Sequence, residues 1–69
     1  MSYCRLAADS DVYVYRMGGC YAIHVSDREG VLMEKTPELA AATLLRLRGE
    51  GLMVPQRAID GLLEETERP

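Results

Sequence analysis

The sequence predicts a small α+β fold, a three-stranded antiparallel β-meander packed on one face by two C-terminal helices. Three observations predict it. β-Forming residues alternate on both sides of Gly18-Gly19, a helix-start signal stands at 36–38, and an apolar helical stripe follows Pro55. All 69 residues are expected to form one domain, because this length is near the lower limit for a chain that folds alone.

The strands are predicted from β-rich runs separated by turn residues. Gly18-Gly19 favours a type I′ turn, in which both central residues need positive φ, and so predicts a two-residue hairpin. Residues 1–10 have two alternative predictions, an extended lead-in or an additional N-terminal strand. The expected elements, in order, are a short strand at 3–5, a turn at 8–11, strands at 11–17 and 20–26, a turn at 27–30 and a strand at 31–34.

The helix signals are local and specific. Thr36 can act as N-cap, Pro37 suits the first helical position, and Glu38 favours the positive end of the helix dipole. This first helix is expected to end at Gly49 or Gly51. Pro55 opens a second helix with one apolar stripe, and Gly61 inside it costs about 1 kcal/mol relative to Ala. The stripe consists of Ala58, Ile59, Leu62 and Leu63.

The two-residue turn fixes the hairpin register and gives its two faces different chemistry. One face, here called the aliphatic face, carries Val12, Val14, Ile23 and Val25 and is expected to pack against the helices. The other, here called the outer face, carries Tyr13, Tyr15, Met17, Cys20, Ala22 and His24. A bulge at Cys20 would shift the register by one residue and mix the two faces.

The outer face has two interpretations. Antiparallel sheets commonly leave one face to water, and residues 1–10 could also fold over it. Alternatively, it is a contact surface, because Tyr and Met are favoured in protein interfaces. The chain has no Trp and no Phe, so its small core gains little from aromatic burial and favours a partner or a homodimer as added stability.

Composition and termini suggest an ordinary globular protein of the cytoplasm. The chain is 48% hydrophobic and 28% charged, which is not the composition of a disordered protein. Cys4 and Cys20 are expected to be reduced thiols, since cytosolic proteins seldom form disulfides. The sequence has no signal-peptide pattern and no apolar stretch of about 18 residues that could span a membrane.

Catalytic and ligand-binding patterns are weak. His24 is the only histidine, its expected neighbour is Tyr13, and no catalytic residue is predicted. Cys20 and His24 would lie about 13 Å apart along one strand, too far to bind one zinc ion, so no metal and no cofactor is expected. A net charge of −3 without clustered Lys and Arg argues against nucleic-acid binding.

Glu64, Glu65 and Glu67 cluster at the end of the second helix, where negative charge opposes the helix dipole. One interpretation is a well-solvated terminus. The other is an acidic patch offered to a basic partner, such as a nucleic-acid-binding host protein.

Three segments resemble a group of very small proteins carried by tailed phages and prophages. They are Met1-Ser2-Tyr3-Cys4-Arg5, Asp11-Val12-Tyr13-Val14-Tyr15 and Tyr21-Ala22-Ile23-His24-Val25. The resemblance is good over residues 1–26 and loose beyond them, and it brings no established activity. It implies a phage or prophage accessory protein that acts in the bacterial cytoplasm. Many phage proteins of this size bind a host protein, among them inhibitors of host defence such as anti-CRISPR proteins.

The sequence therefore predicts a non-enzymatic protein-interaction module that binds a host protein. The residues expected to contact the partner are Tyr13, Tyr15, Met17 and His24 on the outer face, with Glu64, Glu65 and Glu67 as a second contact. The alternative is a structural homo-oligomer in which the outer face associates with itself about a two-fold axis.

Overall fold

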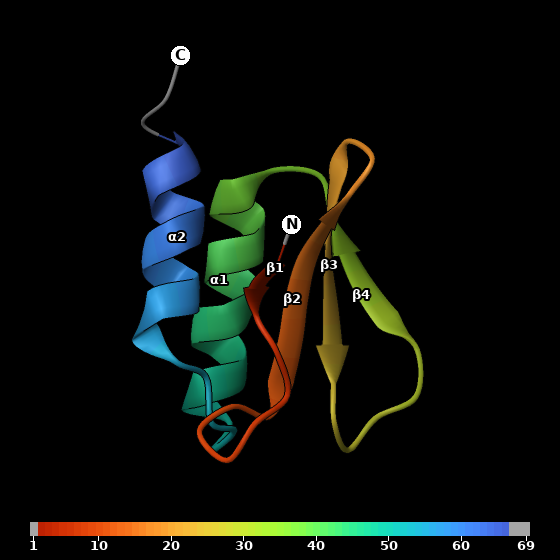
Figure 1. Ribbon diagram of the computed structural model, residues 1–69, viewed down its shortest axis with the longest axis vertical. Coiled ribbons are helices and arrows are strands. Elements are labelled where there is room, and N and C mark those ends of the chain that lie inside the picture. The colour runs from red at the N-terminus through yellow and green to blue at the C-terminus, as the bar shows by residue number, and fades with distance from the viewer. Residues whose placement is uncertain (1, 67–69) are drawn as a thin grey trace.

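The protein has two layers, a four-stranded antiparallel sheet and a pair of helices packed against one of its faces (Figure 1). The structure is a computed structural model and describes residues 2–66. The strands follow chain order across the sheet: β1 (Ser2–Cys4), β2 (Val12–Met17), β3 (Cys20–Val25) and β4 (Val31–Glu34). The helices are α1 (Pro37–Gly49) and α2 (Gln56–Thr66). The predicted α+β fold is confirmed, and the N-terminal segment adds a strand to it.

The β2–β3 hairpin has the register that a two-residue turn imposes. Met17 pairs with Cys20, and Val14 pairs with Ile23. The prediction of a type I′ turn is wrong, because only the first glycine, Gly18, has a positive φ, of 62°. This is the pattern of a type II′ turn, which also connects strands through two residues and therefore leaves the predicted register unchanged.

The aliphatic face and the helices enclose the core. Helix α1 begins as predicted, with Thr36 Oγ1 accepting a hydrogen bond of 3.1 Å from the Leu39 N–H. Leu63, expected on the apolar stripe of α2, lies at its margin and is 43% exposed. The largest fully buried side chains are Val12, Val14, Ile23, Val25, Leu44, Leu47, Ile59 and Leu62. Each contributes about 1.5–3 kcal/mol of hydrophobic stabilisation.

Strand β1 connects the sheet to α2. It pairs with β2 at one edge of the sheet, and its Tyr3 packs against the helix. Gly61 makes this contact possible, since a Cβ atom at position 61 would lie 3.1 Å from Cδ1 of Tyr3. The close approach of the ring therefore explains a glycine that lowers the helix propensity of α2.

Asp11 ties the start of β2 to the connection between the helices. Its N–H donates to the carbonyl oxygen of Met53 at 2.8 Å, and its Oδ2 accepts from the Met53 N–H at 2.8 Å. Its own carbonyl oxygen accepts from the Ser26 N–H at 2.9 Å. These bonds hold the end of the hairpin against the helical layer.

Candidate protein-binding face

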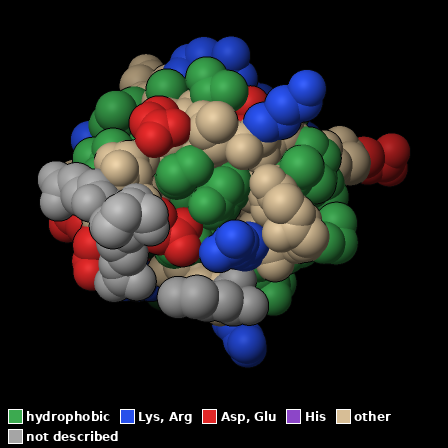
Figure 2. Space-filling model, turned by 90° about the horizontal axis from the view of Figure 1, so that it is seen from above, with side chains coloured by type: hydrophobic (Ala, Val, Ile, Leu, Met, Phe, Trp, Pro, Cys, Tyr) green, Lys and Arg blue, Asp and Glu red, His purple; other side chains and the backbone are tan. Residues whose placement is uncertain are grey.

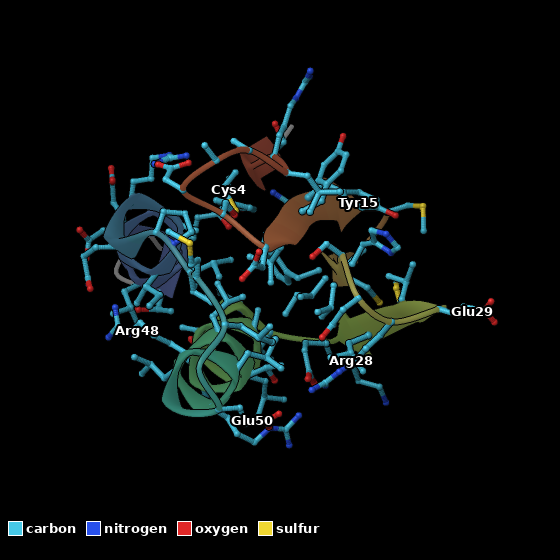
Figure 3. The ribbon with its side chains drawn as sticks, turned by 90° about the horizontal axis from the view of Figure 1, so that it is seen from below. Cys4, Tyr15, Arg28, Glu29, Arg48 and Glu50 are labelled. Atoms are coloured by element: carbon cyan, nitrogen blue, oxygen red, sulfur yellow. The ribbon has the colours of Figure 1, made fainter. Side chains whose placement is uncertain are left out.

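The outer face points away from both helices of the described chain and gathers side chains from three strands. The pairing of β4 with β3 places Val31 opposite His24 and Met33 opposite Ala22, so these two β4 residues extend the predicted surface. Viewed from below, Tyr15 projects away from the helices, whereas Cys4 points inward between the layers (Figure 3). The outer face of the folded protein thus consists of Tyr13, Tyr15, Met17, Cys20, Ala22, His24, Val31 and Met33.

Tyr13 and Tyr15 form the centre of this face. Their ring centroids are 4.8 Å apart with an interplanar angle of 64°, an edge-to-face arrangement that aromatic pairs favour. Both side chains are half-buried. Ala22 lies between Tyr15 and Met33 in the cross-strand row and is fully buried, because its small side chain lets larger neighbours close over it. The two rings therefore pack against each other within the chain itself.

Three other apolar side chains of the outer face remain open to solvent. Met17 is 54% exposed, Met33 is 47% exposed and Val31 is 43% exposed. Methionine is unbranched and polarizable, so it adapts its shape to a partner more readily than other apolar residues do. The outer face therefore combines a pair of packed aromatic rings with adaptable methionine side chains.

His24 lies opposite Tyr13, as the register predicts. Its Nδ1 is 3.3 Å from the carbonyl oxygen of Gly30, so the imidazole contacts the β3–β4 turn. Cys4 is buried and Cys20 is half-buried, and the structure has both as free cysteines. Within residues 2–66, no three His, Cys, Asp or Glu side chains gather as a metal-binding group.

The predicted acidic cluster is divided by the fold. Glu65 turns toward the sheet, where it accepts a hydrogen bond from the Tyr3 hydroxyl and lies 3.8 Å from Nη1 of Arg16. Its side chain is only 16% exposed. Glu64 lies on the exposed side of α2, and Glu67 lies outside the described residues. Glu65 therefore serves the fold itself, by joining α2 to β1 and β2.

Burial and this contact raise the pKa values of two tyrosines. Burial, followed by the hydrogen bond to Glu65, raises the pKa of Tyr3 well above its usual range. Burial and then the Glu65 carboxylate also raise the pKa of Tyr21, whose ring centroid is 6.1 Å from that of Tyr3. Both phenols are therefore held in the neutral form.

The raised pKa values predict a loss of stability in alkali. A group whose pKa is higher in the folded than in the unfolded state stabilises the fold below its unfolded pKa, which is about 10 for tyrosine, and loses that contribution as pH rises further. The urea midpoint of the native protein should therefore fall above about pH 10. The fall should be shallower for Tyr3→Phe. Equal falls in the two proteins would contradict the effect assigned to Tyr3.

Within residues 2–66, several charged side chains pair with one another. Arg57 Nη1 lies 2.7 Å from Asp9 Oδ2, and Arg28 Nη2 lies 2.9 Å from Glu50 Oε1. Arg48 donates to Gln56 Oε1 at 2.8 Å. Seen from above, basic, acidic and apolar side chains are interspersed (Figure 2). No helix within residues 2–66 has the length and apolar character needed to cross a membrane.

Comparison with known proteins identifies no family. No family model, no curated protein and no solved structure matches this chain. Function is therefore inferred from the geometry of the outer face and from the chemistry of its side chains.

Proposed function

We propose that this chain is a non-enzymatic protein-binding module and that its outer face is the docking surface. One observation carries the proposal. The edge-to-face Tyr13–Tyr15 pair shares one face of the sheet with exposed apolar side chains, while both helices lie against the opposite face. Tyrosine and methionine are enriched in the cores of protein interfaces, where large side chains of low entropy give the most binding energy.

The chemistry of the face suggests how a partner would bind. The tyrosine rings offer apolar contact area and two hydroxyl groups, and His24 adds a polar group beside them. Met17 and Met33 would then adjust to the partner's surface. The resemblance to small phage and prophage proteins supports a host protein, met in the bacterial cytoplasm, as the partner. A host defence protein is one such partner.

The double substitution Tyr13→Ala with Tyr15→Ala is expected to weaken binding at least about tenfold, because buried interface tyrosines are frequent hot spots. Proteins retained from a bacterial lysate by the immobilised native chain would be identified by mass spectrometry. Their affinities would then be measured with purified components. Circular dichroism would verify that the variant keeps its fold.

Two further variants make this test decisive. Met17→Glu places a charge on the same face at an exposed position, so it should weaken binding without disturbing the core. Leu45→Ala is the matched control, because Leu45 is 46% exposed on α1, away from the outer face. A partner that binds both outer-face variants as tightly as the native chain would rule out this surface.

Self-association through the same face is the alternative, since the exposed side chains that suit a partner also suit a second copy. Sedimentation of the isolated chain separates the two accounts. A dimer that dissociates when Tyr13 and Tyr15 are replaced would support the structural homo-oligomer. A monomer at micromolar concentration would exclude it.

A further inference from the structure

The two edges of the sheet differ in how they are protected. β1 has three residues, and its Tyr3 is packed on α2 at Gly61. β4 lies on the opposite side of the sheet, far from α2 (Figure 1). Its residues Val31, Leu32 and Met33 are 43%, 37% and 47% exposed, and the strand contains no Lys or Pro. An exposed apolar edge of this kind is a template for pairing with another strand.

The alternation of hydrogen bonds across the sheet determines which backbone N–H and C=O groups of β4 point toward the open edge. The single bond from the Ser26 N–H to the Asp11 carbonyl continues the β2–β3 ladder and sets its phase, so that the next pair, Val12 and Val25, is a non-hydrogen-bonded pair. Along an antiparallel ladder, bonded and non-bonded pairs alternate, so the backbone groups of Ile23 are directed toward β4 and not toward β2. Leu32, the partner of Ile23, therefore directs its own N–H and C=O inward to β3.

The neighbours of Leu32 in β4 have the opposite orientation. The N–H and C=O groups of Val31 and Met33 point away from β3, toward the open edge. The edge thus presents two donors and two acceptors, separated by one residue. The Val31 and Met33 side chains lie on the outer face, and the Leu32 side chain lies on the helix-facing side.

We propose that a second copy of this chain pairs with β4, antiparallel, with the two-fold axis at Leu32. Val31 of each copy then lies opposite Met33 of the other, and these pairs use the edge donors and acceptors of both strands. Glu29 precedes β4 in the turn and Lys35 follows the strand, so the antiparallel pairing brings Glu29 of each copy to the same end of the paired segment as Lys35 of the other. The edge is therefore complementary to itself in backbone bonding, in apolar side chains and in charge.

The helix-facing side of the hairpin favours the same occupant. A hollow lies beside Leu32, where Gly30 contributes no side chain. In the proposed pairing, Leu32 of the second copy is directed toward this hollow. The hollow is lined by Ile23, Val25, Arg28, Glu29, Gly30, Val31 and Leu32. Since the two-fold axis is perpendicular to the sheet, the outer faces of both copies lie side by side and stay open for the partner proposed above.

Reversing the charges of Glu29 and Lys35 tests the proposed pairing of two β4 strands. The native chain should sediment as a dimer at high micromolar concentration. Glu29→Lys or Lys35→Glu alone should weaken the dimer about tenfold, because two attractive pairs become two repulsive ones. The variant with both substitutions should recover the native affinity, since the pairs are restored with their signs exchanged. A monomeric native chain, or a double variant as weak as the single ones, would overturn the proposal.

An engineered disulfide tests whether the two-fold axis of the dimer lies at Leu32. In a Cys20→Ser background, Leu32→Cys should form an intermolecular disulfide on mild oxidation, because facing residues of a non-bonded pair have Cα atoms about 4.5 Å apart. Val31→Cys is the control, since its two copies would lie roughly 8 Å apart, beyond disulfide reach. Crosslinking through position 31 and not 32 would contradict this register. A dimer abolished by Tyr13→Ala with Tyr15→Ala, yet insensitive to charge exchange, would assign self-association to the outer face instead.

Discussion

Leu44→Ala is expected to lower the free energy of unfolding by about 2–5 kcal/mol. Leu44 is fully buried between α1 and the sheet, so removing its side chain loses apolar contacts and leaves a cavity. A domain of this size has only a few kcal/mol of net stability. The variant should therefore be largely unfolded at physiological temperature, as measured by urea titration with circular dichroism.

Leu45→Ala provides the matched control, because it makes the same chemical change at the next residue of the same helix. Leu45 is 46% exposed, so its replacement should change the free energy of unfolding by no more than about 0.5 kcal/mol. Similar losses in the two variants would mean that the buried side of α1 has been assigned wrongly.

Tyr3→Phe is expected to lower the free energy of unfolding by about 1.5–3 kcal/mol, because it removes a hydrogen bond to a charged acceptor. The Glu65 carboxylate accepts this bond with little exposure to water, and without it the carboxylate keeps the longer contact with Arg16 and the interaction with Tyr21. Glu65→Gln should cost less than Tyr3→Phe, since the amide still offers an acceptor oxygen to the tyrosine hydroxyl.

Tyr15→Phe is the control for this contact, since it makes the same change on the outer face. Its free energy of unfolding should stay within about 0.5 kcal/mol of the native value. Equal losses for Tyr3→Phe and Tyr15→Phe in urea titrations would show that Glu65 does not hold α2 against β1.

The hairpin and the helices could be predicted because their signals are local. Gly18-Gly19 sets the register of β2 and β3 without reference to the rest of the chain. Thr36 and Pro37 mark the start of α1 through their own hydrogen bonding and backbone angles. Since side chains alternate along a strand, the two faces of the hairpin follow from its register.

The position of β1 and the role of Glu65 depend on distant residues and could not be predicted. Tyr3 and Glu65 are 62 residues apart, and their contact exists only because the sheet and α2 pack together. Gly61 was the one available signal. A glycine one helical turn before Glu65 marks the side of α2 on which a large side chain approaches closely.

The candidate site was predicted in part. The tyrosine pair lies on the predicted face, but the contribution of β4 required the register between β3 and β4, which the turn at 27–30 does not fix. Val31 and Met33 of β4 enlarge the surface. The fully buried Ala22 lies between Tyr15 and Met33, whose larger side chains cover it.

The central claim is that a partner protein docks on the outer face. Methyl NMR of the methionines during titration with a captured partner tests it most directly, because three of them report on different places. Met17 and Met33 lie on the outer face, whereas Met53 lies between α1 and α2 and is 50% exposed. Binding should shift or broaden the methyl signals of Met17 and Met33 and leave that of Met53 unchanged. A change at Met53 with none at Met17 and Met33 would contradict docking on the outer face.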